Sequence, residues 1–136
     1  MTEQIDEQRF AEGSLTDPEV VRTFALSAAR TLRDNKCDDI VLLDVRGLSH
    51  VTDYVVIGSG TSQRQMGSAL QHVEDMAKES NFARVHTSRD DQSLWLLADF
   101  VDVVVHLFEP NTRAYYDLEM LWGDAPRVEW NDKAEP

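Results

Sequence analysis

The sequence contains a single cysteine, Cys37, among 136 residues. One thiol has no intramolecular partner for a disulfide and supplies too few ligands for a structural zinc site of the usual spacing. No apolar run approaches the roughly 18 to 20 residues that cross a bilayer, and residues 1–12 lack the basic and apolar segments of a signal peptide. We therefore expect a cytoplasmic protein that does not contact the membrane.

Basic residues are also scarce, with 13 Lys and Arg against 25 Asp and Glu and a net charge of −12. No segment forms a basic arm. Nucleic-acid binding takes most of its affinity from Lys and Arg that displace counterions from phosphates, so we expect little direct nucleic-acid binding. An acidic surface attracts a basic partner by electrostatic steering, although acidity also simply keeps a protein soluble.

The composition is that of one globular domain, with 42% hydrophobic and 28% charged residues. A chain of this length has room for one domain with a substantial core. Residues 1–16 are polar and acidic and are expected to form a flexible N-terminal tail. Residues 17–130 then form the single domain, and residues 131–136 a loose C-terminal tail.

The apolar pattern predicts an α/β fold with a mixed five-stranded sheet and packed helices. Two near-continuous apolar runs, residues 40–45 and 54–57, are typical of strands buried on both faces. Asp17 and Pro18 are typical of a helix start, and the pattern continues to Asp34. The predicted order is α-β-β-α-β-β-β-α, with helices over 17–34, 63–79 and 111–121, and strands over 40–45, 54–57, 82–86, 94–98 and 103–108.

Three connections follow from this pattern. Ser62 and Gln65 predict a capping box for the helix over 63–79. The strand over 82–86 is expected to return parallel to the second strand through a right-handed crossover, and a polar turn follows at 89–92. The last two strands are close in sequence and predict an antiparallel hairpin.

The turn Gly58-Ser59-Gly60-Thr61-Ser62 between a strand and a helix invites a phosphate-binding interpretation. It lacks the Gly-Lys-Ser/Thr end of a P-loop and the third glycine of a dinucleotide site. Nucleotidyl transfer needs carboxylates that converge on a metal ion, and the first acids after the turn, Glu74 and Asp75, point about 100° apart on a helix. A tight capping turn is favoured, and a nucleotide-binding or nucleotidyl-transferring enzyme stays as the alternative.

Other side chains do not assemble a catalytic or metal site in the sequence. Cys37 is followed by Asp38 and Asp39, whose charge disfavours a reactive thiolate. The histidines fall on separate predicted elements, without a metal-binding pair. We therefore expect no catalytic residues, no metal and no cofactor. The histidines are His50, His72, His86 and His106.

Aromatic residues and carboxylates gather in the last third of the chain. Trp95, Tyr115, Tyr116 and Trp122 are interspersed with aspartate and glutamate. Such residues can complete a core, but aromatic side chains among acids also suit an interface with a basic partner. Around Trp95 both faces of the predicted strand are apolar, so alternation leaves open whether Trp95 is core or interface.

Six motifs occur in a fixed order over roughly residues 20–128, and together they resemble the ribosomal silencing factor (Iojap-like) family. They are Asp39-Ile40 through Leu43-Asp44-Val45-Arg46-Gly47-Leu48-Ser49, Thr52-Asp53-Tyr54, Gly60-Thr61-Ser62-x-Arg64-Gln65, Trp95-x-x-x-Asp99, Asp102-Val103-Val104-Val105-His106 and Tyr116-Asp117-Leu118-Glu119-x-Leu121-Trp122-Gly123-Asp124-Ala125-Pro126.

The resemblance implies a translation repressor that is not an enzyme, with a fold related to nucleotidyltransferases. It implies binding to the large ribosomal subunit through the basic ribosomal protein L-fourteen, which sterically blocks joining of the small subunit, mainly under nutrient limitation or in stationary phase. Family members can be homodimers. With the flanking acids, the resemblance favours an interface role for Trp95. The expected partner-binding residues are Trp95, Asp99, Asp102, Tyr116, Glu119, Leu121 and Trp122.

Two departures from the family pattern stand out. Relatives commonly carry Gly-x-Glu-Gly before the tryptophan strand, whereas this chain has Val85-His86-Thr87-Ser88-Arg89-Asp90-Asp91. Relatives also often place glycine before Asp102, where Val101 stands here. Because a β-branched residue resists positive φ, we expect a different geometry for this turn.

Overall fold

The computed structural model describes residues 17–82, 86–90 and 94–132. Its centre is a mixed sheet of five strands in the order β1-β2-β5-β4-β3. The parallel pair is β2 with β5, and the remaining neighbours are antiparallel. The strands are β1 (Asp38–Asp44), β2 (Tyr54–Ser59), β3 (His86–Asp90), β4 (Trp95–Asp99) and β5 (Val103–Phe108).

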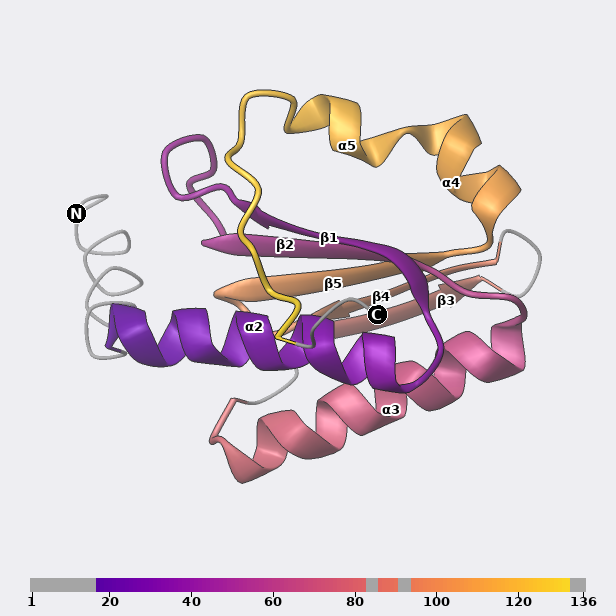
Figure 1. Cartoon of the computed structure of the whole chain (residues 1–136), viewed down its shortest axis with the longest axis horizontal. Coiled ribbons are helices and arrows are strands. Elements are labelled where there is room, and N and C mark those ends of the chain that lie inside the picture. The colour runs from indigo at the N-terminus through magenta and orange to yellow at the C-terminus, as the bar shows by residue number, and fades with distance from the viewer. Residues whose placement is uncertain (1–16, 83–85, 91–93, 133–136) are drawn as a thin grey trace.

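Two long helices cover one face of the sheet, and two short helices lie over the other (Figure 1). The long helices are α2 (Pro18–Asp34) and α3 (Gln63–Glu79), and the short ones are α4 (Pro110–Tyr116) and α5 (Leu118–Leu121). This layering confirms the expected α/β class with a mixed five-stranded sheet and packed helices.

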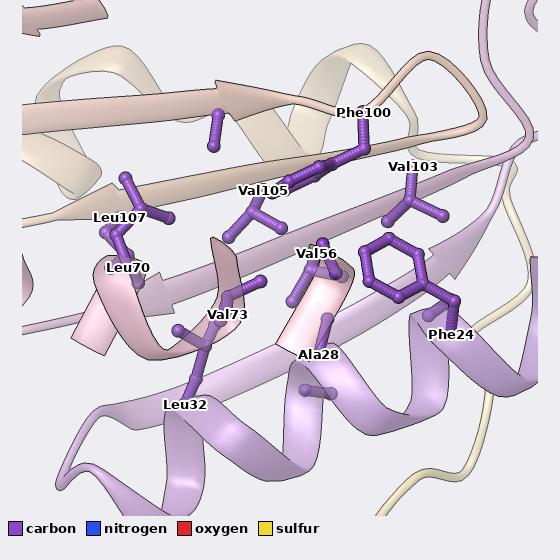
Figure 2. Close-up of a cluster of buried hydrophobic side chains, with 14 of the residues drawn as sticks. Phe24, Ala28, Leu32, Val56, Leu70, Val73, Phe100, Val103, Val105 and Leu107 are labelled. Carbon is purple, nitrogen blue, oxygen red and sulfur yellow. The ribbon is translucent and has the colours of Figure 1, made fainter. Parts of the chain in front are cut away.

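The main core lies between the sheet and the two long helices (Figure 2). Phe24 of α2 stacks on Phe82 with ring centroids 4.3 Å apart, and it meets Phe100 edge-on at 5.4 Å. Val56 and Val105 project from the two parallel strands into the same cluster. Neighbouring residues of β1 and β2 pack in a second cluster on the opposite face of the sheet. The near-continuous apolar runs of these strands therefore reflect burial on both faces, as the sequence predicted.

The starts of both long helices follow the sequence signals. Asp17 caps α2, because its carboxylate accepts a hydrogen bond from the Glu19 amide at 2.9 Å. Ser62 caps α3 by accepting from the Gln65 amide at 3.1 Å. The Gln65 side chain completes the cap one residue earlier than in a standard capping box, since it accepts from the Thr61 amide at 3.0 Å.

The predicted strand over 82–86, parallel to β2, is wrong. The strand is β3, which begins at His86 and pairs antiparallel with β4, with Thr87 opposite Ala98. Within the described residues β3 has a single neighbour, and an edge strand does not need an apolar run. Arg89 and Asp90 therefore belong to a strand and not to the expected polar turn, while residues 83–85 and 91–93 lie outside the described residues.

The single helix expected over 111–121 is divided into α4 and α5. Asp117 separates them with a left-handed backbone, at φ 47° and ψ 52°. Its amide donates to the Arg113 carbonyl at 2.8 Å, which closes the last turn of α4. Aspartate tolerates this conformation better than most residues, so the chain changes direction here without a glycine.

The β4–β5 hairpin agrees with the sequence, but its turn does not. Val101 adopts φ 75° in spite of its branched side chain, so the expected avoidance of positive φ is wrong. The Asp99 carboxylate accepts a hydrogen bond from the Val101 amide at 2.8 Å and holds the turn in this conformation. The backbone that a glycine would adopt freely is thus imposed on a valine.

We expect Val101→Gly to raise the free energy of unfolding by about 1 kcal/mol, because relief of the left-handed strain exceeds the entropy that glycine adds to the unfolded chain. Urea denaturation measures the change. Val101→Ala is the matched control, and its free energy of unfolding should rise less, since the alanine Cβ keeps most of the strain. A glycine variant less stable than the alanine variant would contradict the assignment of strain to this residue.

Residues 123–132, here called the C-terminal strap, pass from α5 across the edge strand β1 to α2 (Figure 1). The Val128 amide donates to the Leu42 carbonyl at 2.8 Å, and the Asp44 amide donates to the Pro126 carbonyl at 2.9 Å. Asn131 and Asp132, expected in the loose tail, both accept hydrogen bonds from Arg33. Residues 1–16 and 133–136 lie outside the described residues.

Candidate functional site

The two faces of β4 have different environments, which the sequence could not distinguish because its residues are apolar on both faces. Leu96 and Ala98 point toward the long helices and belong to the main core. Trp95 and Leu97 point to the opposite face and are partly exposed. Trp95 is therefore on the face that α4 and α5 cover incompletely.

Four ring side chains form an aromatic cluster on this face: Trp95, His106, Phe108 and Tyr116. The Trp95 ring lies 4.9 Å from the Phe108 ring and 4.9 Å from the Tyr116 ring. Phe108 is fully buried and forms the floor of the cluster, whereas Tyr116 is about half exposed. The cluster thus joins the core to the surface beside α4.

Trp95 and His106 are also joined by a hydrogen bond. The indole Nε1 donates to Nδ1 of His106 at 3.2 Å. Nδ1 can accept only when it carries no proton, so the imidazole is neutral with its proton on Nε2. Burial lowers the pKa of His106 from its ordinary 6.5 to about 4, and the nearby Asp99 carboxylate opposes part of this shift.

This shift predicts a pH dependence of stability. The unfolded chain binds a proton at His106 below pH 6.5, whereas the folded chain resists it down to about pH 4. Stability linked to His106 is therefore full above pH 6.5 and is lost as the pH falls toward 4, by about 3 kcal/mol. The difference in the free energy of unfolding between the wild type and His106→Asn, measured by urea denaturation, should narrow as the pH falls across this range, because asparagine does not titrate. A constant difference would contradict the prediction.

The exposed surface of α4 and α5 is unusually apolar. Tyr115, Met120 and Leu121 are 82%, 75% and 72% exposed, and the Tyr115 ring lies 5.1 Å from the ring of Tyr116. We call these four residues the α4–α5 patch. Clustered large apolar side chains at the surface of a soluble domain are typical of an interaction site. Of the four, Tyr116 and Leu121 belong to the set expected from the sequence.

Trp122 has a different role from its exposed neighbours. Together with Leu118 it packs against a second core cluster on this side of the sheet, which includes Val55, Ile57 and Phe108. It therefore anchors α5 to the sheet more than it faces solvent.

Arg113 links the short helices to the sheet and was not singled out from the sequence. Its guanidinium donates to Glu119 at 2.9 Å, to the Ser59 hydroxyl at 2.8 Å and to the Asp39 carbonyl at 2.7 Å. The Glu119 carboxylate, expected at the interface, is thus bound within the protein. Arg113 and Glu119 together hold α5 against the end of β2.

Asp99 and Asp102 lie at the opposite end of the hairpin from Trp95. Trp95 pairs with Phe108 at one end of β4, while Asp99 is at the other, roughly 13 Å along the strand. Asp102 is 8% exposed, and its carbonyl accepts from the amides of Asp53 and Tyr54 at 2.9 and 3.1 Å. The structure therefore separates these two acids from Trp95, although Asp99 still interacts with His106, and it gives Asp102 a structural role.

The glycine turn is occupied by the protein's own side chains. The hydroxyl of Ser59 accepts from Arg113, and Ser62 and Gln65 cap the first turn of α3. Gly60 is closely covered by Met66 and Gln65, so a Cβ there would collide with both side chains. These contacts explain the glycine by packing and engage the polar side chains of the turn within the protein.

Comparison with known proteins identifies the family. The family model described as "Ribosomal silencing factor during starvation" matches residues 18–136. The chain belongs to the ribosomal silencing factor family. The ribosomal silencing factor of Bacillus subtilis is 40% identical over 99 residues, which cover 73% of this chain and 84% of that protein.

Solved structures of similar proteins agree with this assignment. A crystal structure of a Chromobacterium violaceum protein superposes with a TM-score of 0.70 at 30% identity, covering 88% of this chain and 96% of that one. A Bacillus halodurans protein gives a TM-score of 0.64 at 34% identity, covering 75% and 92%.

The family to which the chain belongs is described as one of regulatory proteins. Burial raises the pKa of the Cys37 thiol, opposed by a hydrogen bond from Gln65 and reinforced by the charge of Asp38. In the part of the chain that the structure describes, no group of three or more His, Cys, Asp or Glu could hold a metal ion. No helix of residues 17–82, 86–90 and 94–132 has the length and apolarity to span a membrane.

Proposed function

We propose that this silencing factor represses translation by binding the large ribosomal subunit and blocking its joining with the small subunit. In this proposal it acts in the cytoplasm, mainly under nutrient limitation, and docks on the basic ribosomal protein L-fourteen. The observation that carries the proposal is the exposed α4–α5 patch beside the half-buried Trp95, on a protein with a net charge of −12. The relationship to nucleotidyltransferases that we propose is one of fold, without their chemistry.

The proposed contact surface consists of Trp95 and the α4–α5 patch. Large aromatic and aliphatic side chains at the centre of an interface provide most of its energy, while a polar rim excludes water. The exposed carboxylates of Asp117 and Asp124 border the patch in sequence and suit a basic partner. Asp99 lies at the far rim of this surface, and Glu119 and Trp122 support α5 from within. Asp102 is buried, so we do not include it in the contact surface.

Sedimentation with purified subunits tests this function. The protein should sediment with large subunits alone and not with small subunits, and joined ribosomes should decrease as protein is added. Joining that proceeds normally at saturating protein would refute the blocking mechanism. Sedimentation of the protein by itself tests for the homodimer that family members can form.

The charge of the protein predicts the salt dependence of binding. Association with large subunits should slow as ionic strength rises from about 0.01 to 0.15 M, because the screening length falls from ~30 to ~8 Å. Stopped-flow or surface-binding kinetics measure the association rate. A rate that does not change with salt would show that the net charge serves solubility and not partner attraction.

A further inference from the structure

His106 lies behind Trp95 on the proposed contact surface, at the centre of the sheet. It is on β5, opposite Leu97 of β4 and Ile57 of β2, and it is 9% exposed. Its Nδ1 accepts the indole hydrogen bond at 3.2 Å. A buried acceptor thus faces the one polar atom of a partly exposed aromatic side chain.

This arrangement fixes the indole in two independent ways. Phe108 and Tyr116 pack against the ring with centroids 4.9 Å away, which restricts its tilt. Stacking alone permits the ring to turn over, but the hydrogen bond to His106 requires Nε1 to point inward. The bond therefore selects one orientation and presents the carbon edge of the indole outward.

Preorganisation of this kind matters for binding. A partner that packs on an ordered side chain does not have to immobilise it, and it does not bury an unsatisfied indole N–H. The low pKa that burial gives His106 keeps the imidazole neutral, and therefore able to accept, throughout the neutral range.

We propose that His106 is a positioning residue for partner recognition, which holds the Trp95 indole in the orientation that the large-subunit protein binds. This inference rests on the proposed function. His106 itself does not need to touch the partner.

Two substitutions separate the acceptor from the bulk of the side chain. His106→Asn keeps an acceptor near the position of Nδ1, because the amide oxygen can occupy it. His106→Leu has almost the same shape as asparagine without the acceptor. Trp95→Phe removes the donor and keeps a stacked ring, so it reports on the same bond without altering the centre of the sheet.

The first measurement is structural and does not depend on ribosomes. In ¹⁵N-labelled protein the Trp95 indole N–H signal, assigned by its loss in Trp95→Phe, should exchange slowly with water in the wild type and in His106→Asn. In His106→Leu it should exchange much faster. Equal protection in all three proteins would overturn the inference.

The second measurement is the affinity for purified large subunits. We expect His106→Leu to weaken binding about tenfold and His106→Asn to stay within about threefold of the wild type. In the Trp95→Phe background, His106→Leu should have little further effect. Equal affinities for the leucine and asparagine variants, or an undiminished leucine effect in that background, would overturn the inference.

These outcomes also distinguish failure of the positioning role from failure of the proposed function. If the wild type fails to bind large subunits, the proposed function fails. If the wild type binds and Trp95→Ala does not, while His106→Leu binds normally, only the positioning role is refuted. Should His106→Leu fold poorly, His106→Val, which also lacks the acceptor, takes its place in both measurements with the same expected outcomes.

Discussion

Replacing Trp95 by alanine is expected to weaken binding to the large subunit by about 2 kcal/mol or more, as loss of an interface hot spot does. The structure supports this expectation because Trp95 lies on the incompletely covered face and adjoins Tyr116 of the α4–α5 patch. Its ring also packs on Phe108, so the free energy of unfolding should fall moderately. Binding and urea denaturation are measured on the same preparation.

Leu96→Ala is the matched control for this substitution. Leu96 is adjacent in sequence but fully buried on the opposite face of β4. Its truncation should cost about 3 kcal/mol of stability through the cavity that it leaves, with affinity retained by the folded fraction. If Trp95→Ala instead destabilises the protein as strongly as Leu96→Ala, or binds as the wild type does, Trp95 is not at the interface.

Replacing Trp130 by alanine is expected to lower the free energy of unfolding by about 3 kcal/mol. Trp130 packs against the main core, its Nε1 donates to the Ile40 carbonyl at 3.1 Å, and its own carbonyl accepts from Arg30 at 2.7 Å. The Arg33 guanidinium lies 5.8 Å from its ring centroid. The side chain thus fastens the C-terminal strap to both β1 and α2.

Loss of this anchor should also expose the hydrogen-bonding edge of β1 to other chains. We expect Trp130→Ala to associate in a concentration-dependent way, measured by light scattering, while Trp130→Phe keeps the packing and loses only about 1 kcal/mol. Glu129→Ala, at an exposed neighbouring position, should behave as the wild type. An alanine variant that is as stable and as monodisperse as this control would show that the strap is not needed to protect the edge.

The sequence predicted those elements whose apolar residues are buried against the sheet. The start of α2, the cap of α3, the buried runs of β1 and β2 and the β4–β5 hairpin all carry strong local signals. The signal for β3 is weak because an edge strand can be polar. The break at Asp117 and the strained turn at Val101 depend on left-handed backbone conformations that cannot be predicted from an aspartate or a valine in the sequence.

The candidate site was only partly accessible to sequence reasoning. Clustered aromatic and acidic residues directed the prediction to the last third of the chain, where Tyr116 and Leu121 are exposed. Arg113 was missed because two of its partners, Ser59 and Asp39, are distant in sequence. Asp102 is found buried because the β5 hairpin folds against the start of β2, a contact that pattern alone does not reveal.

β2 and β5 pair at the middle of the sheet, although a long chain segment separates them in the sequence. β1 with β2 and β4 with β5 are local hairpins that can form early, but joining them requires closure of the loop that contains α3, β3 and β4. Loop closure costs entropy before the new contacts repay it. Docking of the two hairpins should therefore limit the folding rate, and the protein should fold more slowly than helical domains of its size.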